Sequence, residues 1–476
     1  MKVRFLFAAI AALLLAGAAR AEDAEEAEYQ RRWKAAANTV ARAQRLCARW
    51  CNDNRLYAAA WAEWTESLDF EPDHEDARKA LGFAKKDGAW VFNPDAGMLR
   101  ENRGTPKEID AALDSYRRRR EGIEATAGRE LVPLAEWTAK HGYEARAKRI
   151  WSLVHRYDPE NEDACKAMGW SEWKGRWFAP REAAARKAAA KLMEEADGGK
   201  ADTKPSDIQK ATGFRLARRV SAHFAFEGRP SQEELAPMLR AAEAARALFV
   251  ETFRLDATQE PATVTGVFLT SNLDHKLFLE KCSPLDEEER KTIEKLGGWA
   301  SFKPDLIFEL WTNGSFPEYH REAGVHILVH LLFQMHTRIK MPPGWIQEGL
   351  GFWFTDLLTG TAMARCTDLR SNAMEDDRAL STLTWRRMVR QRLREGTDPS
   401  IRRVLNARYD DLDLPKMVKA WSLVDFMLAK KRDGFFAYVK RLGEGDSGTD
   451  ALAESLEMES VDDLQRGWEE YVDENY

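Results

Sequence analysis

Two histidines stand four residues apart in the segment His326-Ile-Leu-Val-His330. On a helix, side chains with this spacing project from one face, so both imidazoles could bind one metal ion. Taken alone, the spacing also suits a pair of buried, hydrogen-bonded core histidines. A second predicted helix follows Pro342-Pro-Gly and would place Glu348 on the face that opposes the histidines. The added carboxylate makes metal binding the better interpretation.

These two segments resemble the paired motifs of the gluzincins, the thermolysin-type branch of zinc peptidases (the peptidase MA group). Gluzincins carry His-Glu-x-x-His on one helix and a third ligand, a glutamate, on the next, commonly within a phrase such as Trp-x-x-Glu-Gly. The segment Trp345-Ile-Gln-Glu348-Gly349 matches that phrase. The resemblance implies zinc as the cofactor, with His326, His330 and Glu348 as its ligands. Three protein ligands and one open position are typical of a catalytic zinc site rather than a structural one.

One position departs from the family pattern. Ile327 stands where gluzincins carry the glutamate that takes a proton from the zinc-bound water and later delivers it to the leaving amine. Isoleucine can do neither, and loss of a positioned general base typically costs about 10²–10⁴-fold in rate. Glu322 lies one helical turn before His326 and is the candidate substitute base. A partner that orients His326, or a surface carboxylate, is the better interpretation of Glu322.

Other side chains near the motif are candidates for stabilising the oxyanion or for further histidine chemistry. Gluzincins usually present a tyrosine or histidine that stabilises the oxyanion, and the segment Lys416-Met-Val-Lys-Ala420 contains neither. Tyr409 is the nearest candidate. His320 and His336 lie off the ligand face, and we expect them to be solvated or packing histidines. Two parts of the catalytic machinery are thus missing together, which favours erosion of activity.

The elements that must position this site are predicted from residue 209 onward. The strand candidates are Ala222–Phe226, Val264–Leu269 and Asp305–Trp311. Ser231–Phe253 has the period of a long amphipathic helix, another helix begins near Pro317, and the chain from about Thr382 to Tyr476 is mostly helical. A few strands followed by helices predict an α+β, predominantly helical fold. By the resemblance, Leu306–Leu310 is the edge strand that binds substrate backbone, and Ala420–Met427 resembles the helix that closes the domain in bacterial relatives.

The N-terminal half contains an internal repeat. Ala48–Trp90 returns as Ala135–Trp177 without a gap, at a constant offset of 87 residues. Small alanines and large tryptophans recur at helical spacing, which predicts a helix pair, and an acidic-Pro-acidic break then starts a short helix. Gly88 and Gly175 suit a turn that leaves the last helix. The pattern loosely resembles tetratricopeptide repeats, but the offset is far longer than one such repeat, so we expect two separate helical units of a partner-binding kind.

The N-terminus has the features of an export signal. Lys2 and Arg4 precede an apolar run from Phe5 to about Ala16, and Ala19-Arg20-Ala21 supplies the small residues that a signal peptidase reads. A membrane span needs roughly 20 apolar residues, and this run is shorter. We therefore expect an exported protein, periplasmic or secreted, with no transmembrane segment after signal removal. The predicted parts are a signal peptide (1–21), helical repeat unit 1 (22–100), helical repeat unit 2 (101–180), a helical or flexible linker (181–208) and a gluzincin-like domain (209–476).

Composition narrows the functional classes. A hydrophobic fraction of 44% and a charged fraction of 32% are typical of a soluble globular protein. The net charge is −6 and no domain is basic, which argues against nucleic acid as a partner. The run Arg117–Arg120 is interpreted as a solvated helix face.

Cysteine usage does not indicate a disulfide framework, because the number is odd and the residues are scattered. The five cysteines are Cys47, Cys51, Cys165, Cys282 and Cys366. Cys47 and Cys51 would share a helix face. A bridge or half of a metal site is conceivable there, and two packed thiols are the better interpretation.

From these features we predict an exported, catalytically inactive zinc peptidase homologue that binds zinc and a peptide or protein partner. One alternative is an active zinc peptidase with a non-standard general base such as Glu322. The other is a non-enzymatic helical-repeat scaffold, in which His326 and His330 merely pack in a core.

Overall fold

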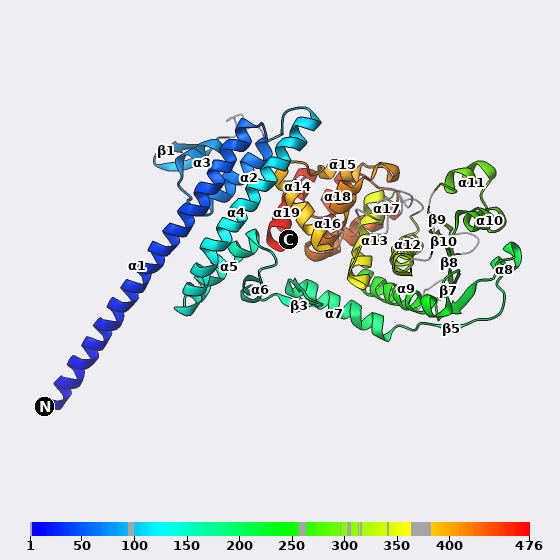
Figure 1. The fold of residues 1–476 in the computed structure, drawn as a ribbon, viewed down its shortest axis with the longest axis horizontal. Coiled ribbons are helices and arrows are strands. Elements are labelled where there is room, and N and C mark those ends of the chain that lie inside the picture. Colours follow the sequence, from blue (N-terminus) through cyan, green and yellow to red (C-terminus); the bar gives the residue numbers. More distant parts are fainter. Residues whose placement is uncertain are drawn as a thin grey trace. The chain divides into compact units, whose positions relative to one another are not determined.

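The chain forms two compact units in the computed structural model. Unit 1 comprises Met1–Ala183 and Leu393–Thr397, and unit 2 comprises Ala184–Arg392 and Asp398–Tyr476. The structure describes residues 2–93, 100–256, 263–295, 297–301, 306–312, 314, 317–339, 342–362 and 382–476. The fold is α+β and predominantly helical, as predicted (Figure 1).

Unit 1 contains the same helical arrangement twice. The helices are α1 (Lys2–Asp53), α2 (Tyr57–Leu68) and α3 (Glu75–Ala80), followed by α4 (Pro106–Lys140), α5 (Glu144–Tyr157) and α6 (Glu162–Ala167). α1 packs against α2 and α4, and α4 packs against α5. The bounds of α3 and α6 differ by the same 87 residues as the two sequence copies. Both copies therefore contain the helix pair and the short helix that the repeat predicts.

Each copy ends in a β-hairpin, which the sequence interpretation missed. The antiparallel pairs are β1 (Phe83–Lys86) with β2 (Ala89–Phe92), and β3 (Ser171–Trp173) with β4 (Arg176–Phe178). Asp87-Gly88 and Lys174-Gly175 have positive φ at both residues, as a two-residue type I′ turn requires. The prediction that Gly88 and Gly175 lead out of a helix is wrong. The residues with positive φ that directly follow the short helices are Gly82 and Gly169.

A cluster of charged side chains lies inside unit 1. Arg120 Nη1 is 3.0 Å from Glu63 Oε1 and 2.8 Å from Glu66 Oε2, and the arginine side chain is only 6% exposed. Arg394 Nη2, from the short segment Leu393–Thr397, donates to Glu66 Oε1 at 2.9 Å. The expected solvated face at Arg117–Arg120 is therefore wrong for Arg120, because two carboxylates of α2 surround it.

The described cysteines are free thiols. Cys47 and Cys51 are both buried on α1, as packed thiols would be. Cys165 and Cys282 are also free, and Cys366 lies outside the described residues.

Unit 2 contains a mixed sheet with the strand order β5-β6-β7-β8-β10-β9 among its described residues. The strands are β5 (Lys200–Ala201), β6 (Ala217–Val220), β7 (Phe224–Gly228), β8 (Val264–Leu269), β9 (Gly298–Ser301) and β10 (Ile307–Trp311). β7, β8 and β10 run parallel, and the other pairings are antiparallel. β7, β8 and β10 correspond to the three predicted strands, while Asp305 lies outside the described residues. β5 falls within the segment predicted as a linker.

The predicted edge strand at Leu306–Leu310 is wrong. β10 is paired on one side with β8 and on the other with β9, so β9 is the terminal strand at this end of the described sheet. The sequence interpretation missed β9, because a four-residue strand leaves little periodic signal.

Helices cover both faces of this sheet. Side chains alternate between the faces of a strand, so Val267 packs with Phe278 of α10 (Asn272–Cys282), while Phe268 faces His320 of α12 (Pro317–Thr337). α9 (Gln232–Phe253) packs against β6, β7 and α12. Ser231 caps α9 in a capping box with Glu234, which fits the predicted helix start.

The remaining described helices complete both units, and α7 and α14 each contribute residues to both of them. They are α7 (Pro180–Glu195), α8 (Asp207–Thr212), α11 (Glu287–Ile293), α13 (Gly344–Thr359), α14 (Thr382–Glu395), α15 (Ile401–Leu405), a 3₁₀ turn (Tyr409–Asp411), α16 (Leu414–Lys430), α17 (Arg432–Gly443), α18 (Thr449–Ser455) and α19 (Val461–Asn475). The segment Ala420–Met427 lies within α16. Over the described part of the chain, no helix has the length and apolar character that crossing a membrane requires.

Candidate metal centre

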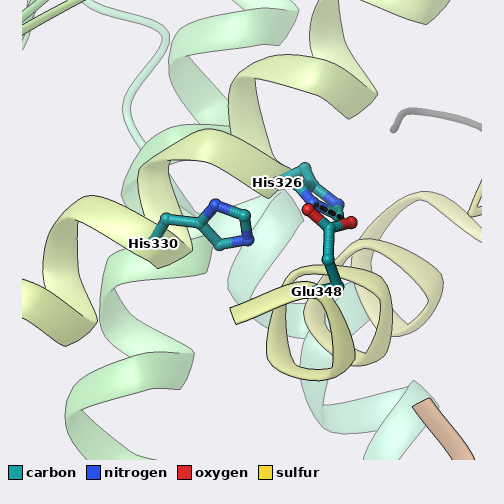
Figure 2. Close-up of side chains that lie close together, drawn as sticks. All are labelled: His326, His330 and Glu348. Carbon is teal, nitrogen blue, oxygen red and sulfur yellow. Dashed lines mark ion pairs between the residues drawn. The ribbon is translucent and has the colours of Figure 1, made fainter. Parts of the chain in front are cut away.

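The side chains of His326, His330 and Glu348 converge inside unit 2 (Figure 2). Each offers one ligand atom, and these atoms lie within 4.8 Å of one another. His326 Nε2 is 3.3 Å from Glu348 Oε2, and the two imidazole centroids are 4.6 Å apart. All three residues are buried, with Glu348 at 0% exposure. The three residues predicted as ligands therefore form a group that could hold a metal ion.

Two packed helices bring these residues together. α12 carries both histidines one helical turn apart, and α13 carries Glu348 in its second turn. α12 packs against α13, and α13 packs against α16. Pro343 stands at the N-cap of α13, and Gly360 ends the helix in the left-handed conformation with φ 84°. The carboxylate of Glu348 thereby faces the two imidazoles (Figure 2).

Two glycines set how closely α13 approaches its neighbours. A Cβ atom on Gly351 would lie 2.6 to 2.8 Å from three ring atoms of His326. A Cβ atom on Gly349 would lie 2.7 Å from the carbonyl oxygen of Ala420 in α16. Glycine is unfavourable inside a helix, so two glycines in the phrase Glu348-Gly-Leu-Gly351 were a signal of close packing. The sequence interpretation did not use it.

Two polar atoms of this group, one on His326 and one on Glu348, have no ordinary hydrogen bond among the described residues. His326 Nε2 and Glu348 Oε2 face each other without a well-formed hydrogen bond, although both atoms are buried. Buried polar atoms in native proteins nearly always have a partner. A metal ion between the nitrogen and the oxygen would satisfy both, so the donor set fits a metal.

The surroundings favour the protonation states that bind a metal. Burial, together with the neighbouring imidazole of His326, lowers the pKa of His330 to about 3, which keeps this ring neutral at pH 7. Burial acts to raise the pKa of Glu348, but the two histidines and the Tyr409 hydroxyl outweigh it and lower this pKa below its ordinary value. A neutral imidazole and an ionised carboxylate are the forms that coordinate metals.

Ile327 and Glu322 differ in exposure on the histidine helix. Ile327 is half-buried, whereas its neighbours on both sides along α12 are buried. Glu322 is only 2% exposed, so the interpretation of it as a surface carboxylate is wrong. Among the described residues, the group of converging ligand atoms contains only the two histidines and Glu348, and Glu322 is not part of it.

Tyr409 contacts the carboxylate ligand. Its hydroxyl donates a hydrogen bond of 2.8 Å to Glu348 Oε1. The sequence singled out Tyr409 as the nearest oxyanion donor, but this hydrogen bond is to the predicted ligand. No local pattern in the sequence indicates such a pairing, since 61 residues separate the two.

The two remaining histidines near the motif are packing residues. His320 is buried, with Nε2 at 3.0 Å from Thr312 Oγ1 and its ring against Phe268. His336 stacks on Phe249 with a centroid distance of 5.8 Å. Neither belongs to the converging group among the described residues.

Comparison with known proteins does not add a relative to this picture. No model of a known protein family matches the chain, and a search of curated proteins found no match either. The resemblance to gluzincins therefore remains an interpretation of the motif residues.

Proposed function

We propose that this chain is a catalytically inactive homologue of the gluzincin zinc peptidases, which binds zinc and a peptide or protein partner. The observation that carries the proposal is the buried convergence of His326, His330 and Glu348, with Ile327 at the general-base position of the helix that carries both histidines. Packing an apolar helix does not require two imidazoles and a carboxylate at one point, which weighs against a purely structural scaffold.

Zinc fits the chemistry of these donors. Two imidazoles and one carboxylate are a common protein ligand set for zinc, with a fourth position left for water or a bound group. Zinc bound in this way acidifies a coordinated water molecule and polarises a carbonyl oxygen. The hydrocarbon side chain of Ile327 can neither accept nor donate a proton, so a peptide held here keeps its bond intact.

Metal content and peptide hydrolysis test the proposal together. We expect the purified protein to contain one zinc per chain and to leave a mixed peptide library uncleaved. Glu348→Gln keeps the shape of the side chain and removes its charge. Loss of a supporting hydrogen bond typically weakens metal binding by about 10–100-fold, and we expect this substitution of a ligand to weaken zinc binding by more than that. Clear cleavage that a chelator abolishes would overturn the inactive assignment, and absence of bound metal would favour the scaffold.

An active peptidase that uses Glu322 is the second candidate, because this carboxylate is buried one helical turn before His326. In that case Glu322→Gln abolishes turnover and leaves zinc bound. If Glu322 instead supports the histidine helix, Glu322→Gln lowers the stability of the protein, and neither the wild type nor the variant hydrolyses peptides.

The proposal also includes export, which the features of residues 1–21 support. Mass spectrometry of the N-terminus after expression with export machinery tests it, with cleavage expected after Ala21. An uncleaved N-terminus would contradict this part of the proposal and leave the metal site unaffected.

A further inference from the structure

We infer that Tyr409 is a positioning residue, which holds Glu348 in the orientation where one oxygen binds the metal and thereby keeps a coordination position open. This inference rests on the proposed metal site. It concerns the two oxygens of one carboxylate, which have different surroundings in the structure.

The two oxygens of Glu348 are distinguished by their contacts. Oε1 accepts the hydrogen bond from the Tyr409 hydroxyl at 2.8 Å. Oε2 points toward His326, with Nε2 at 3.3 Å, and has no well-formed hydrogen bond among the described residues. Because Glu348 is 0% exposed, bulk water does not compete for either oxygen. The tyrosine therefore occupies one oxygen and leaves the other for the metal.

The backbone around Tyr409 is placed by packing. A Cβ atom on Gly344, the first residue of α13, would lie 2.9 Å from Leu412 Cδ1 and 3.3 Å from Tyr409 Cα. Glycine thus lets the tyrosine segment lie directly against the start of the Glu348 helix. Leu412 is itself buried at 4% exposure and anchors this segment in the core.

Lys416 forms hydrogen bonds with the residues that follow Tyr409 and so stabilises the same segment. Lys416 Nζ donates to the carbonyl oxygen of Asp411 at 2.7 Å and to Asp413 Oδ2 at 2.8 Å. Asp413 caps α16 by accepting from the Lys416 backbone amide at 3.1 Å. The tyrosine hydroxyl is therefore presented from a fixed turn, although the residue as a whole is 37% exposed.

The hydrogen bond has a chemical consequence for a bound metal. A free carboxylate can bind a cation through one oxygen or through both. Donation to Oε1 reduces the electron density that this oxygen can offer, so binding through Oε2 alone is favoured. Without the hydroxyl, the carboxylate is no longer held in one orientation, and it can approach a metal through either oxygen or through both. Removal of such a supporting partner typically weakens metal binding by about 10–100-fold.

Tyr409→Phe tests the inference, because it keeps the ring and removes only the hydroxyl. The dissociation constant for zinc is measured by competition with a chromogenic chelator, and the coordination geometry by the visible spectrum of the cobalt(II) protein. We expect zinc affinity about 10–100-fold weaker and an altered cobalt spectrum. The metal-free protein should lose some stability, because the buried Glu348 Oε1 then lacks its donor, so the cobalt spectrum is the readout that separates positioning of the metal ligand from folding. Tyr438→Phe is the matched control, since its hydroxyl donates to the Ser447 carbonyl oxygen at 3.4 Å, outside the converging group.

Gly344→Ala gives an independent test, because its Cβ displaces the tyrosine segment and leaves the hydroxyl in the sequence. It should reproduce the cobalt spectrum of Tyr409→Phe. If wild-type and Tyr409→Phe proteins bind zinc equally within twofold and have the same cobalt spectrum, the inference is overturned while the zinc site stands. If the wild-type protein binds neither zinc nor cobalt, both this inference and the proposed function are overturned.

Discussion

At the scale of single residues, Ile327 is the departure from the gluzincin motif on which the proposed lack of activity rests. The side chain is half-buried beside a buried metal-ligand candidate, so a longer polar side chain can extend from this position without entering the core. This exposure fits a site where a general base would meet solvent. Under the proposed function, the side-chain chemistry at Ile327 of α12 accounts for the lack of a general base, while the three converging residues are in place.

Ile327→Glu is expected to restore part of that chemistry. A carboxylate at residue 327 supplies the proton acceptor that isoleucine lacks, and a positioned base contributes about 10²–10⁴-fold. We expect a gain near the lower limit, because Tyr409 is engaged with Glu348. The measurement is chelator-sensitive hydrolysis of a peptide library by zinc-loaded protein. Ile327→Gln has the same shape without the base and should remain inactive. Equal rates for the two variants with zinc bound would contradict this account of Ile327.

The sequence was sufficient to predict which three residues converge, but not what surrounds them. His326 and His330 follow from the helical period, and Glu348 from a phrase that a family resemblance supports. The Tyr409 contact depends on how α16 and the turn before it fold back on α13, which no local pattern contains. For that reason the sequence did not predict the contact between the Tyr409 hydroxyl and Glu348.

At the scale of elements, α13 controls the site through its glycines. Gly351→Ala places a methyl group 2.6 to 2.8 Å from three atoms of the His326 ring, so the ring or the helix must move. Because ligand placement must be accurate to about 0.5 Å, we expect zinc binding to weaken by about 10-fold or more. Isothermal titration of the metal-free protein with zinc checks this.

Gly324→Ala is the matched control on the neighbouring helix. Its Cβ would meet only ring atoms of Phe268 at 3.5 Å, which is ordinary van der Waals contact. Zinc affinity should therefore stay within twofold of wild type. If Gly351→Ala also stays within twofold, close packing of α13 against His326 does not limit metal binding.

Elements were predictable where local signals agreed with tertiary packing. α9 has a capping box at Ser231 and a long apolar period, and its predicted range differs from the structure by only one residue. Asp87-Gly88 is an equally local signal for the turn of a β-hairpin, but Gly88 was interpreted from the sequence as part of a turn that leaves a helix. The strand order of the sheet, in contrast, is not given by a local sequence signal. β9 becomes the terminal strand only through pairing with β10, and such pairing is decided by the whole domain.

At the scale of the whole molecule, each unit has buried polar groups that its own interior must accommodate. In unit 1, Arg120 is matched by two carboxylates. In unit 2, burial lowers the pKa of His320 and of His330 on α12 below the ordinary histidine value. The pH dependence of global stability is expected to follow from such histidines, because an unfolded chain exposes them to protons.

His320 provides the clearest case outside the ligand group. Burial lowers its pKa from 6.5 to about 4, against a smaller opposing effect of Glu234. The unfolded chain binds this proton more readily than the folded one. Its contribution to stability is therefore complete above about pH 6.5 and is lost as the pH falls toward 4. The pKa difference corresponds to on the order of 3 kcal/mol.

Urea unfolding of the metal-free protein between pH 7.5 and pH 4.5 measures this effect. The free energy of unfolding should decrease with falling pH in the wild-type protein and decrease less in His320→Gln. Glutamine does not titrate, and its amide can still contact Thr312. Protonation of His320 in the unfolded chain lowers the free energy of unfolding of the wild-type protein, and glutamine removes this effect. Parallel curves for wild type and His320→Gln would therefore show that other groups cause the acid sensitivity of the fold.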